Sequence, residues 1–346
     1  MSGFDAQAIR RDFPLFAAQQ EPLHYLDNGA TAQIHAAALA AIQQHELTAR
    51  GNVMRGNHRL AERATLAYEA ARSRVAAFLN AAQADEVIFT GGTTAAINLL
   101  AAALGPQLGA GDEIVVSLAE HHSNFLPWQA LQDRGVLLRI LPVRADGRLE
   151  LEALSGLLTT RTRLLALTHA SNVTGAITDV PAVVHAARQV GALVLLDGAQ
   201  RVQHGPVDVQ ALGCDFYAFS GHKCFGPTGI GVLWGRREAL AELPPFMRGG
   251  GMVGQVGVAQ STWAAVPRRF EAGTPPIAQA VGLGAALEAI QALDWAAIRA
   301  HETALLQQLL ADLQTLPGLR CAGTARHPAA PASGVVCVRA GRSASA

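Results

Sequence analysis

Short apolar runs alternate with helical patterns along most of the chain. The apolar runs cover residues 86–90, 113–117, 136–141, 163–169, 192–197, 215–219 and 229–234. Continuous runs of this length are typical of strands that are covered on both faces, as in a mostly parallel sheet. Between them, helical patterns occupy residues 93–104, the stretch near 127–134, and residues 180–191. The alternation predicts an α/β domain built on a seven-stranded, mostly parallel sheet.

Helical patterns also flank this sheet on both sides. Before it, the segment 60–79 repeats apolar residues at helical spacing, at Leu60, Ala64, Ala67, Ala71, Val75 and Phe78. After it, helices are predicted near 277–293 and 297–316, followed by a strand-like run at 334–340. We therefore predict an N-terminal arm over 1–20, a large domain over 21–262, and part of a small α/β domain over 263–346.

Composition excludes several classes of partner. The chain has 346 residues, half of them apolar and 16% charged, with a net charge of zero, so no basic surface is expected for nucleic acid or an anionic membrane. The N-terminus lacks the apolar core of a signal peptide, and the small-apolar run 95–105 is too short to span a bilayer. The four cysteines form no CxxC pair, which favours a reduced, cytoplasmic protein without a disulfide framework or a metal site.

Polar residues follow the ends of several predicted strands. Ligands of open parallel sheets bind at the carboxyl ends of the strands. The residues at these positions are Thr93, Thr94, His121, His122, Asn172, Asp197, Gln200, Ser220, His222 and Lys223. We expect them to form one polar ring at one edge of the sheet.

Three of these positions carry complementary chemistry. The Gly-Gly-Thr-Thr stretch 91–94 opens a helix, where backbone N–H groups hold a phosphate or simply cap the helix. Asp197 ends an apolar strand and needs a partner, either a protonated pyridine nitrogen or a cation within the protein. Lys223 lies between two apolar strands, so it is either an exposed turn residue or an amine that forms an imine with an aldehyde. Pyridoxal phosphate requires these three groups together.

Five longer motifs identify a family. They are SGHKCFGPTGIG (220–231), LVLLDGAQ (193–200), LTHASNVTG (167–175), EHHSNFLPWQ (120–129) and FEAGTPP (270–276). In order and spacing they resemble the pyridoxal-phosphate-dependent cysteine desulfurases of the SufS/CsdA type, in the class V aminotransferase family, from about residue 10 to 340. The resemblance implies the fold-type I transferase architecture. It also implies conversion of L-cysteine to L-alanine with an enzyme-bound persulfide, which supplies sulfur for iron–sulfur cluster assembly.

The resemblance assigns roles around the cofactor ring. Lys223 would bond covalently to the cofactor and shuttle the substrate's α-proton. Asp197 would pair with the pyridinium nitrogen, and His121 would stack on the ring and relay a proton. Asn172 and Gln200 would lie near the ring hydroxyl.

The resemblance also assigns the phosphate and substrate contacts. Thr94, Ser220 and His222 would hold the phosphate, together with Thr93 at the start of the same helix. Thr274 would reach the phosphate from the other subunit, which implies a homodimer. Arg55 would lie near the substrate entrance.

One part of the family pattern is missing from this sequence. The loop with the nucleophilic cysteine and the arginine that binds the substrate carboxylate have no counterpart after residue 340. We therefore expect a C-terminally truncated small domain, and the sequence leaves open whether the chain turns over. Cys214, Cys224, Cys321 and Cys337 are interpreted as structural residues rather than as replacements for that nucleophile.

Other functions remain to be separated from this one. A second class V enzyme, such as a β-lyase, selenocysteine lyase or transaminase, needs the lysine but no nucleophilic cysteine. A catalytically silent subunit would only dimerise with an active partner. The expected partners are L-cysteine or L-selenocysteine, a second subunit and a sulfur-acceptor protein. The GxGxxG match at 249–254 follows no strand and opens no apolar helix, so a dinucleotide site is not expected; we interpret it as an active-site loop.

Overall fold

The computed structural model describes residues 4–19, 21, 23–54, 56–322 and 337–340. Its main feature is the seven-stranded, mostly parallel sheet that the sequence predicts. The strand order is β1-β7-β6-β5-β4-β2-β3. The chain divides into two compact units. Unit A comprises residues 110–204 and 294–346 with the first four residues, and unit B comprises 5–109 and 205–293. The three-part division into arm, large domain and small domain remains a prediction.

Unit A contains the parallel part of the sheet. Its strands are β2 (Glu113–Ser117), β3 (Leu137–Leu141), β4 (Thr162–Thr168) and β5 (Leu193–Asp197). β2 pairs in parallel with β3 and β4, and β4 pairs in parallel with β5. Residues 164–167 and 194–196 are buried, as expected for strands covered on both faces. The predicted runs therefore become strands with boundaries shifted by one or two residues at most.

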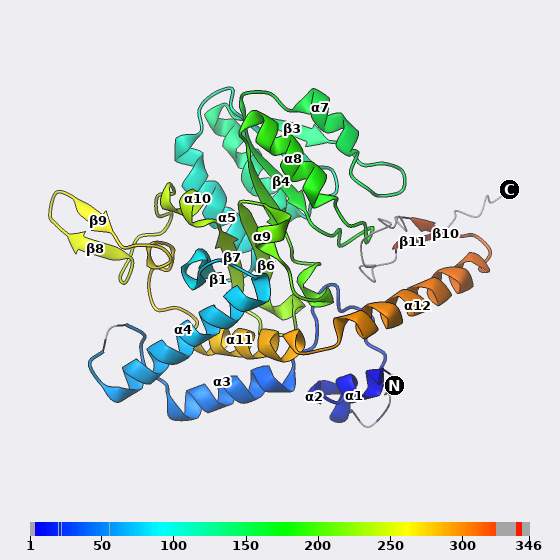
Figure 1. The fold of residues 1–346 in the computed structure, drawn as a ribbon, viewed down its shortest axis with the longest axis horizontal. Helices are drawn as coiled ribbons and strands as arrows, with labels where there is room; N and C mark the ends of the chain where they lie inside the picture. The colour runs from blue at the N-terminus through cyan, green and yellow to red at the C-terminus, as the bar shows by residue number, and fades with distance from the viewer. Residues whose placement is uncertain (1–3, 20, 22, 55, 323–336, 341–346) are drawn as a thin grey trace. The chain divides into compact units, whose positions relative to one another are not determined.

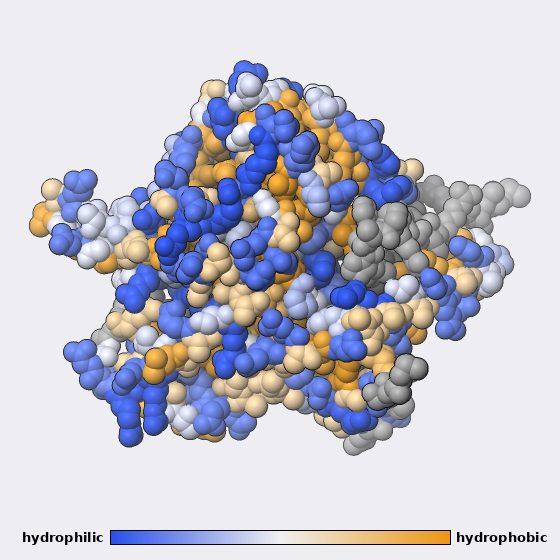
Figure 2. Space-filling view, in the orientation of Figure 1, coloured by the Kyte–Doolittle hydropathy of each residue, from blue (hydrophilic) through white to orange (hydrophobic). Residues whose placement is uncertain are grey.

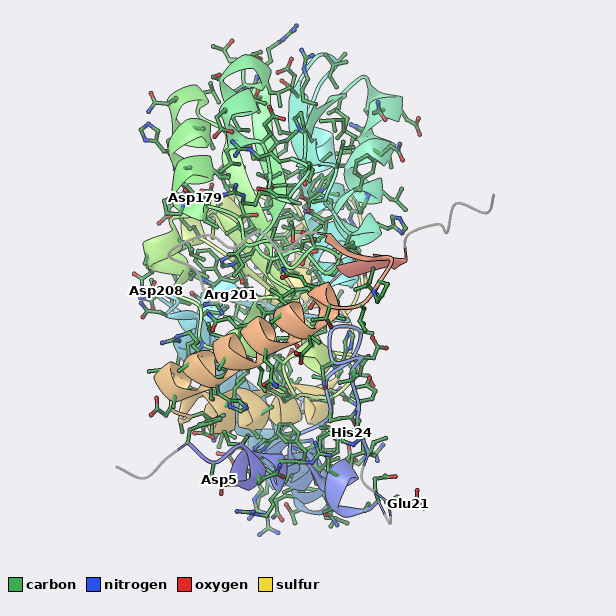
Figure 3. All side chains as sticks on the ribbon, turned by 90° about the vertical axis from the view of Figure 1, so that its right-hand side faces the viewer. Asp5, Glu21, His24, Asp179, Arg201 and Asp208 are labelled. Carbon is green, nitrogen blue, oxygen red and sulfur yellow. The ribbon has the colours of Figure 1, made fainter. Side chains whose placement is uncertain are left out.

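Short helices and one long helix complete unit A. They are α6 (Leu126–Gln129), α7 (Leu154–Leu157), α8 (Val180–Val190) and α12 (Trp295–Gln314), which is followed by the paired strands β10 (Leu319–Ala322) and β11 (Cys337–Ala340). α8 begins where the Asp179 carboxylate accepts a hydrogen bond from the backbone N–H of Ala182, and it ends at Gly191 in the left-handed conformation. Figure 3 shows Asp179 at the start of α8. The predicted strand at 334–340 is confirmed over 337–340, and residues 334–336 lie outside the described residues.

Unit B contains the remaining strands of the sheet and most of the long helices. Its helices are α1 (Ala6–Arg10), α2 (Pro14–Ala17), α3 (Ala36–Thr48), α4 (Arg59–Leu79), α5 (Thr93–Leu104), α9 (Val209–Leu212), α10 (Arg237–Ala241) and α11 (Ile277–Gln291). Its strands are β1 (Val87–Thr90), β6 (Phe216–Ser220), β7 (Gly231–Gly235), β8 (Val253–Val256) and β9 (Ser261–Trp263). β7 runs antiparallel to both β1 and β6. Consequently β1 and β6 point the same way and end at the same edge.

Helices α3, α4 and α11 pack side by side in unit B (Figure 1). α11 approaches α4 so closely that a Cβ atom at Gly284 would lie 2.9 Å from the Cα of Ala71. The buried face of α4 passes through Ala61, Ala64 and Tyr68, whereas Leu60 is 40% exposed. The predicted stripe was therefore wrong at Leu60, because a residue one position away from Ala61 points about 100° away from the core-facing side.

The loop 249–254 does not have the structure of a dinucleotide-binding turn. The loop leads into β8 of an antiparallel hairpin and not into a helix, so it is not the phosphate-binding turn of a dinucleotide site. The hairpin exposes apolar side chains, with Val256 74% exposed, among polar neighbours (Figure 2). In the described part of the chain, no single helix is long and apolar enough to cross a membrane, and α11 and α12 qualify only when taken together.

A buried ion pair joins three segments of unit B. The Arg72 side chain is 1% exposed and donates two hydrogen bonds to the carboxylate of Glu271, at 2.8 and 2.9 Å. The same carboxylate accepts the backbone N–H of Phe89 on β1 at 2.8 Å and the Tyr68 hydroxyl at 3.0 Å. Helix α4, strand β1 and the loop before α11 are thereby held at one carboxylate.

Removing this carboxylate is expected to destabilise the protein strongly. In Glu271→Ala, Arg72 stays buried without its main counter-charge, and such a loss typically lowers the free energy of unfolding by about 3–5 kcal/mol. Urea denaturation measures the change. The matched control is Arg74→Ala on the same helix, which removes an exposed ion pair with Glu288 and should cost less than about 1 kcal/mol. Equal losses in the two variants would contradict the importance of the buried pair.

Candidate active site

In unit B, strand β6 and helix α5 meet through one serine. Ser220 is the last residue of β6, and its Oγ accepts the backbone N–H of Thr93, the first residue of α5, at 2.8 Å. The same Oγ lies 2.7 Å from the Thr93 hydroxyl. The contact fixes the N-terminus of a twelve-residue helix, next to Thr94, at the carboxyl end of a buried strand. The positive end of the helix dipole therefore lies where an anionic group would be stabilised.

The start of α5 is also shaped by close backbone contact. Gly92 precedes the helix with a φ of 137° and provides no side-chain cap. A Cβ atom at Gly231 on β7 would lie only 2.4 Å from the Cα of Gly92. No larger residue fits there, so strand and helix start approach each other through backbone alone. Together with the Ser220 contact, this cradle fits a phosphate group.

Lys223 and His222 lie in the turn directly after β6. The turn, Gly221–Lys223, is a 3-10 helix. His222 Nδ1 lies 3.2 Å from the Thr31 hydroxyl, and burial followed by the nearby Lys223 charge lowers the pKa of the imidazole. His222 is therefore expected to be neutral at pH 7. It directly precedes Lys223 in the sequence, and its contact with Thr31 holds the ring in place.

Cys224 follows the lysine but faces away from solvent. It is fully buried, its Sγ lies 3.3 Å from the carbonyl oxygen of Gly221, and burial raises the pKa of its thiol. Cys214 is also buried. Burial of both thiols supports the structural role predicted for them, because a buried thiol is a poor nucleophile. Cys321 lies within β10. Cys337 is the first residue of β11, where its backbone pairs with that of Ala322.

Lys223 has a feature that the motif-based reading missed. It is the only lysine among the 27 lysine and arginine residues of the chain. An arginine guanidinium stays protonated in proteins, whereas an amine can lose its proton and attack a carbonyl. A simple count of residue types would have singled out this position.

In unit A, polar residues follow the carboxyl ends of β4 and β5. Asp197, the last residue of β5, is 5% exposed, and its Oδ1 accepts the backbone N–H of Ala199 at 3.0 Å. Gln200 is buried nearby in the chain. The backbone N–H of His169 donates to the carbonyl oxygen of Asp197 at 2.8 Å, which joins the two strand ends. Asn172 is exposed in the turn that follows.

His121 lies after β2 in the same unit. Its Nδ1 accepts the backbone N–H of Ser123 at 3.2 Å and caps a short turn over His122–Asn124. Because Nδ1 is the acceptor, the proton of the neutral ring is on Nε2. The ring is exposed, so the hydrogen bond from the turn, and not burial, determines which ring nitrogen carries the proton.

Glu120, directly before His121, was not among the predicted site residues. Its carboxyl group contacts Ser117 at 2.5 Å, Asn124 at 2.6 Å and the backbone N–H of Thr168 at 3.0 Å. Burial raises its pKa to about 8. The EHHSN motif contains Glu120, but its environment depends on a strand almost fifty residues later, which the sequence does not reveal.

Two predicted site residues remain, Thr274 and Arg55. Thr274 is exposed and follows Gly273, whose φ of 90° marks a turn before α11. Arg55 lies outside the described residues. His35 and His58 cap helices α3 and α4. Within the described ranges, no group of three or more His, Cys, Asp or Glu is arranged to hold a metal ion.

Unit B thus groups Thr93, Thr94, Ser220, His222 and Lys223, and unit A groups His121, Asn172, Asp197 and Gln200. An anion cradle beside a lysine, and a buried carboxylate at a strand end, are features of a fold-type I enzyme that binds pyridoxal phosphate. The class V aminotransferase model matches residues 24–345. The chain therefore belongs to the class V aminotransferase family, in its cysteine desulfurase branch.

Individual relatives support the narrower assignment. The chain is 47% identical over 338 residues to a cysteine desulfurase of Synechococcus elongatus, covering 96% of this chain but 54% of that protein. It therefore spans about half the length of this relative. The structure of the cysteine desulfurase CsdA from Escherichia coli superposes with a TM-score of 0.84 at 42% identity, over 92% of this chain and 79% of that one.

A more distant structure is relevant to the cofactor. A C-DES variant with glycine covalently linked to its PLP cofactor aligns with a TM-score of 0.78 at 27% identity, over 91% of this chain and 83% of that one. The fold of this chain is therefore one on which a related protein carries pyridoxal phosphate.

His169 generates a prediction for the pH dependence of stability. Burial, assisted by the charge of Arg201 (labelled in Figure 3), lowers its pKa to about 3. Below pH 6.5 His169 binds a proton in the unfolded chain but not in the folded chain. The free energy of unfolding therefore decreases as the pH falls toward 3, by at most about 1.4 kcal/mol per pH unit. In His169→Gln this contribution should disappear from urea midpoints measured between pH 6.5 and 4. The exposed His122→Gln is the control and should keep the wild-type slope; a wild-type slope in His169→Gln as well would exclude a buried neutral imidazole.

Proposed function

We propose that this chain binds pyridoxal phosphate through Lys223 and removes sulfur from L-cysteine, with L-alanine as the product. The observation that carries the proposal is the only lysine of the chain, in the turn after β6, following the Ser220–Thr93 contact that shapes an anion cradle. The likeness to CsdA supports the reaction, and the PLP-linked C-DES structure supports the cofactor. Selenocysteine is the closest competing substrate, because only the leaving chalcogen differs.

Each predicted residue has a chemical task in this proposal. When bound, pyridoxal phosphate withdraws electrons from the substrate's α-carbon. Lys223 Nζ holds the cofactor covalently and then carries a proton to and from the α-carbon. Asp197, buried at the end of β5, holds a positive charge in place. His121, with its proton on Nε2, contacts the ring face and relays a proton.

The other residues bind and orient. Thr93, Thr94, Ser220 and His222 hold the phosphate, and Asn172 and Gln200 lie near the ring hydroxyl. The buried Cys214 and Cys224 are unsuited to receive the sulfur. The accepting thiol is therefore to be sought elsewhere, on another part of the protein or on a sulfur-acceptor protein.

We further propose a cytoplasmic homodimer. Thr274 of one subunit contacts the phosphate bound in the other subunit, and Arg55 lies near the substrate entrance. The exposed turn at Thr274 and the exposed apolar side chains of the β8–β9 hairpin support a subunit contact in unit B. The free, buried Cys214 and Cys224 are consistent with the proposed compartment.

The single lysine allows an unambiguous test of covalent attachment. Borohydride reduction of the protein with pyridoxal phosphate should fix one cofactor to the peptide that contains Lys223, detected by peptide mass mapping. The only other amine is the N-terminus, so Lys223→Arg, which keeps the positive charge, should lose the label completely. Ser220→Ala should weaken retention of pyridoxal phosphate, because one buried hydrogen bond to the cradle is removed, at a cost of about 1–3 kcal/mol. Label on the N-terminus alone would contradict the proposal.

The dimer proposal predicts complementation between two inactive variants. Lys223→Ala and Thr274→Ala homodimers should each form alanine from L-cysteine much more slowly than the wild type. A mixed dimer should recover up to one working site, because one subunit then supplies Lys223 and the other supplies Thr274. The two variants are unfolded and refolded together, and dithiothreitol is added as the thiol that takes up the sulfur as a persulfide and then reduces it to sulfide. Alanine and sulfide are measured in this mixture. Recovery in the mixture supports a shared site, whereas release of pyruvate in place of alanine by the wild type would identify a β-lyase.

A further inference from the structure

Phe225, two residues after Lys223, has a backbone conformation that phenylalanine rarely adopts. Its φ is 63°, in the left-handed region. In the described part of the chain, only Met54 and Asn80 share this feature among the residues other than glycine. Asn80 ends helix α4, where asparagine is tolerated, whereas a bulky side chain is strained in this conformation. The surroundings of Phe225 must therefore stabilise its backbone.

Two backbone hydrogen bonds from the segment before α3 hold the turn that carries Lys223. The carbonyl oxygen of His222, directly before the lysine, accepts the backbone N–H of Ala32 at 2.9 Å. The carbonyl oxygen of Phe225, two residues after the lysine, accepts the backbone N–H of His35, also at 2.9 Å. The same segment therefore fixes the chain on both sides of the lysine, including the carbonyl group of the strained residue.

One aromatic ring packs against both Phe225 and His35. The Phe13 ring meets the Phe225 ring edge-on, with 5.4 Å between the centroids, and the His35 ring at 5.5 Å. Edge-on aromatic pairs at this separation stabilise a fold beyond the apolar area that they bury. We call these three rings the aromatic cluster. A glycine at position 225 would adopt the same φ without strain, but it would have no ring for this contact.

The N-terminal segment holds Phe13 in place. Pro14 follows it at the start of α2, and the residue before a proline favours extended backbone, as Phe13 has here with a φ of −110° and a ψ of 99°. The carbonyl oxygen of Asp12 accepts the backbone N–H of Ala36, the first residue of α3, at 2.8 Å. The backbone on both sides of Phe13 is thus restrained, so its ring has a defined place against the turn.

We propose that Phe13 is a positioning residue for Lys223: through the aromatic cluster it stabilises the left-handed backbone of Phe225 and thereby fixes where the turn places the lysine amine. The backbone N–H of Gly226 donates to the carbonyl oxygen of Gly221 at 3.0 Å and closes the loop that contains both residues. A shift of Phe225 would therefore also shift Lys223. The catalytic role of the lysine rests on the proposed function, whereas its position in the turn does not.

The cofactor-free protein provides a readout that a purely stabilising role of Phe13 would not change. Because Lys223 is the only lysine, protein labelled with ¹³C at the lysine ε-carbon should give one side-chain NMR signal. We expect this signal to be single and narrow in the wild type. In Phe13→Ala it should shift by more than its linewidth or split, because the turn then adopts more than one conformation. An unchanged signal in Phe13→Ala would overturn the proposal.

Phe16→Ala is the matched control in the same arm. The Phe16 ring meets the Phe13 ring at 6.5 Å and lies 3.8 Å from the Arg10 guanidinium carbon, on the side of the arm. Both alanine variants remove one aromatic ring, so both should lower the urea midpoint. Only Phe13→Ala should change the lysine signal. An equal change in the two variants would show that the arm acts through stability alone and would contradict the proposal.

Phe13→Leu covers the case in which Phe13→Ala does not fold. Leucine keeps most of the apolar volume, so the fold should persist, but it has no ring edge to meet Phe225. The lysine signal of Phe13→Leu should still differ from that of the wild type, by a smaller shift than in Phe13→Ala. A wild-type signal in a folded Phe13→Leu would contradict the role of the aromatic contact.

Two variants at position 225 test the strain directly. Phe225→Ala and Phe225→Gly both lose the ring, but only alanine is strained at a positive φ. The unfolding equilibrium constant, measured in urea, should therefore be about fivefold or more larger in Phe225→Ala than in Phe225→Gly. A glycine variant no more stable than the alanine variant would show that the turn is not held in the left-handed conformation, which would overturn the proposal.

Binding of pyridoxal phosphate separates this proposal from the proposed function. Attachment of pyridoxal phosphate to Lys223, stopped with borohydride at increasing times, should be about tenfold slower in Phe13→Ala than in the wild type, because small displacements of a reacting group are costly. Phe16→Ala should keep the wild-type rate. A lysine signal that changes only in Phe13→Ala, without attachment in any protein, would contradict the proposed function alone. Normal attachment in all three proteins, with one common lysine signal, would contradict the positioning role alone.

Discussion

The sheet restricts where polar side chains can lie along its buried strands. Parallel strands covered on both faces bury their side chains and pair their backbones, so a polar group within β4 or β5 would lose its hydration without gaining a partner. Polar residues are tolerated at strand ends, where backbone N–H groups and neighbouring turns supply hydrogen bonds. Asp197, Ser220 and Glu120 all follow this rule. The chemistry of the chain is concentrated at the strand ends because the rest of each strand excludes it.

Three carboxyl groups, those of Glu113, Glu120 and Glu271, differ in the partners that surround them. Glu113 is more deeply buried than Glu120, yet it stays ionised because Arg139 and two threonine hydroxyls compensate the lost hydration. Glu120 has only neutral donors, and burial dominates. The buried Glu271 resembles Glu113, since Arg72 meets it with two hydrogen bonds. The guanidinium partner and the hydroxyl donors therefore lower the pKa of Glu113 although the residue is buried.

The sequence predicted the elements well and the long-range environments poorly. Apolar runs such as 113–117 and 192–197 predict strands, because a strand that is covered on both faces is apolar along its whole length. The site residues after these strands followed from the general rule for sheet edges and from the family motifs. The face of α4 was misjudged at Leu60, since two adjacent apolar residues fit the periodicity almost equally well. Glu120 was missed because its partners Ser117 and Thr168 are brought together only by the pairing of β2 with β4. The two units are built from discontinuous segments, which no linear division of the sequence can reproduce.

The absence of any second lysine sharpens the chemical argument. Arginine and lysine are equivalent as solvated charges, and an exposed surface accepts either, so the many ion pairs of this chain, such as Arg163 with Asp112, require no amine. Only a reaction that needs a neutral, nucleophilic nitrogen distinguishes them, because a guanidinium group does not give up its proton at physiological pH. A chain that uses arginine at every other cationic side chain and lysine at 223 therefore places its one side-chain amine in the turn that follows the contact between Ser220 and Thr93. The contact between β6 and α5 therefore connects the segment that carries this lysine to the helix end that favours an anionic group.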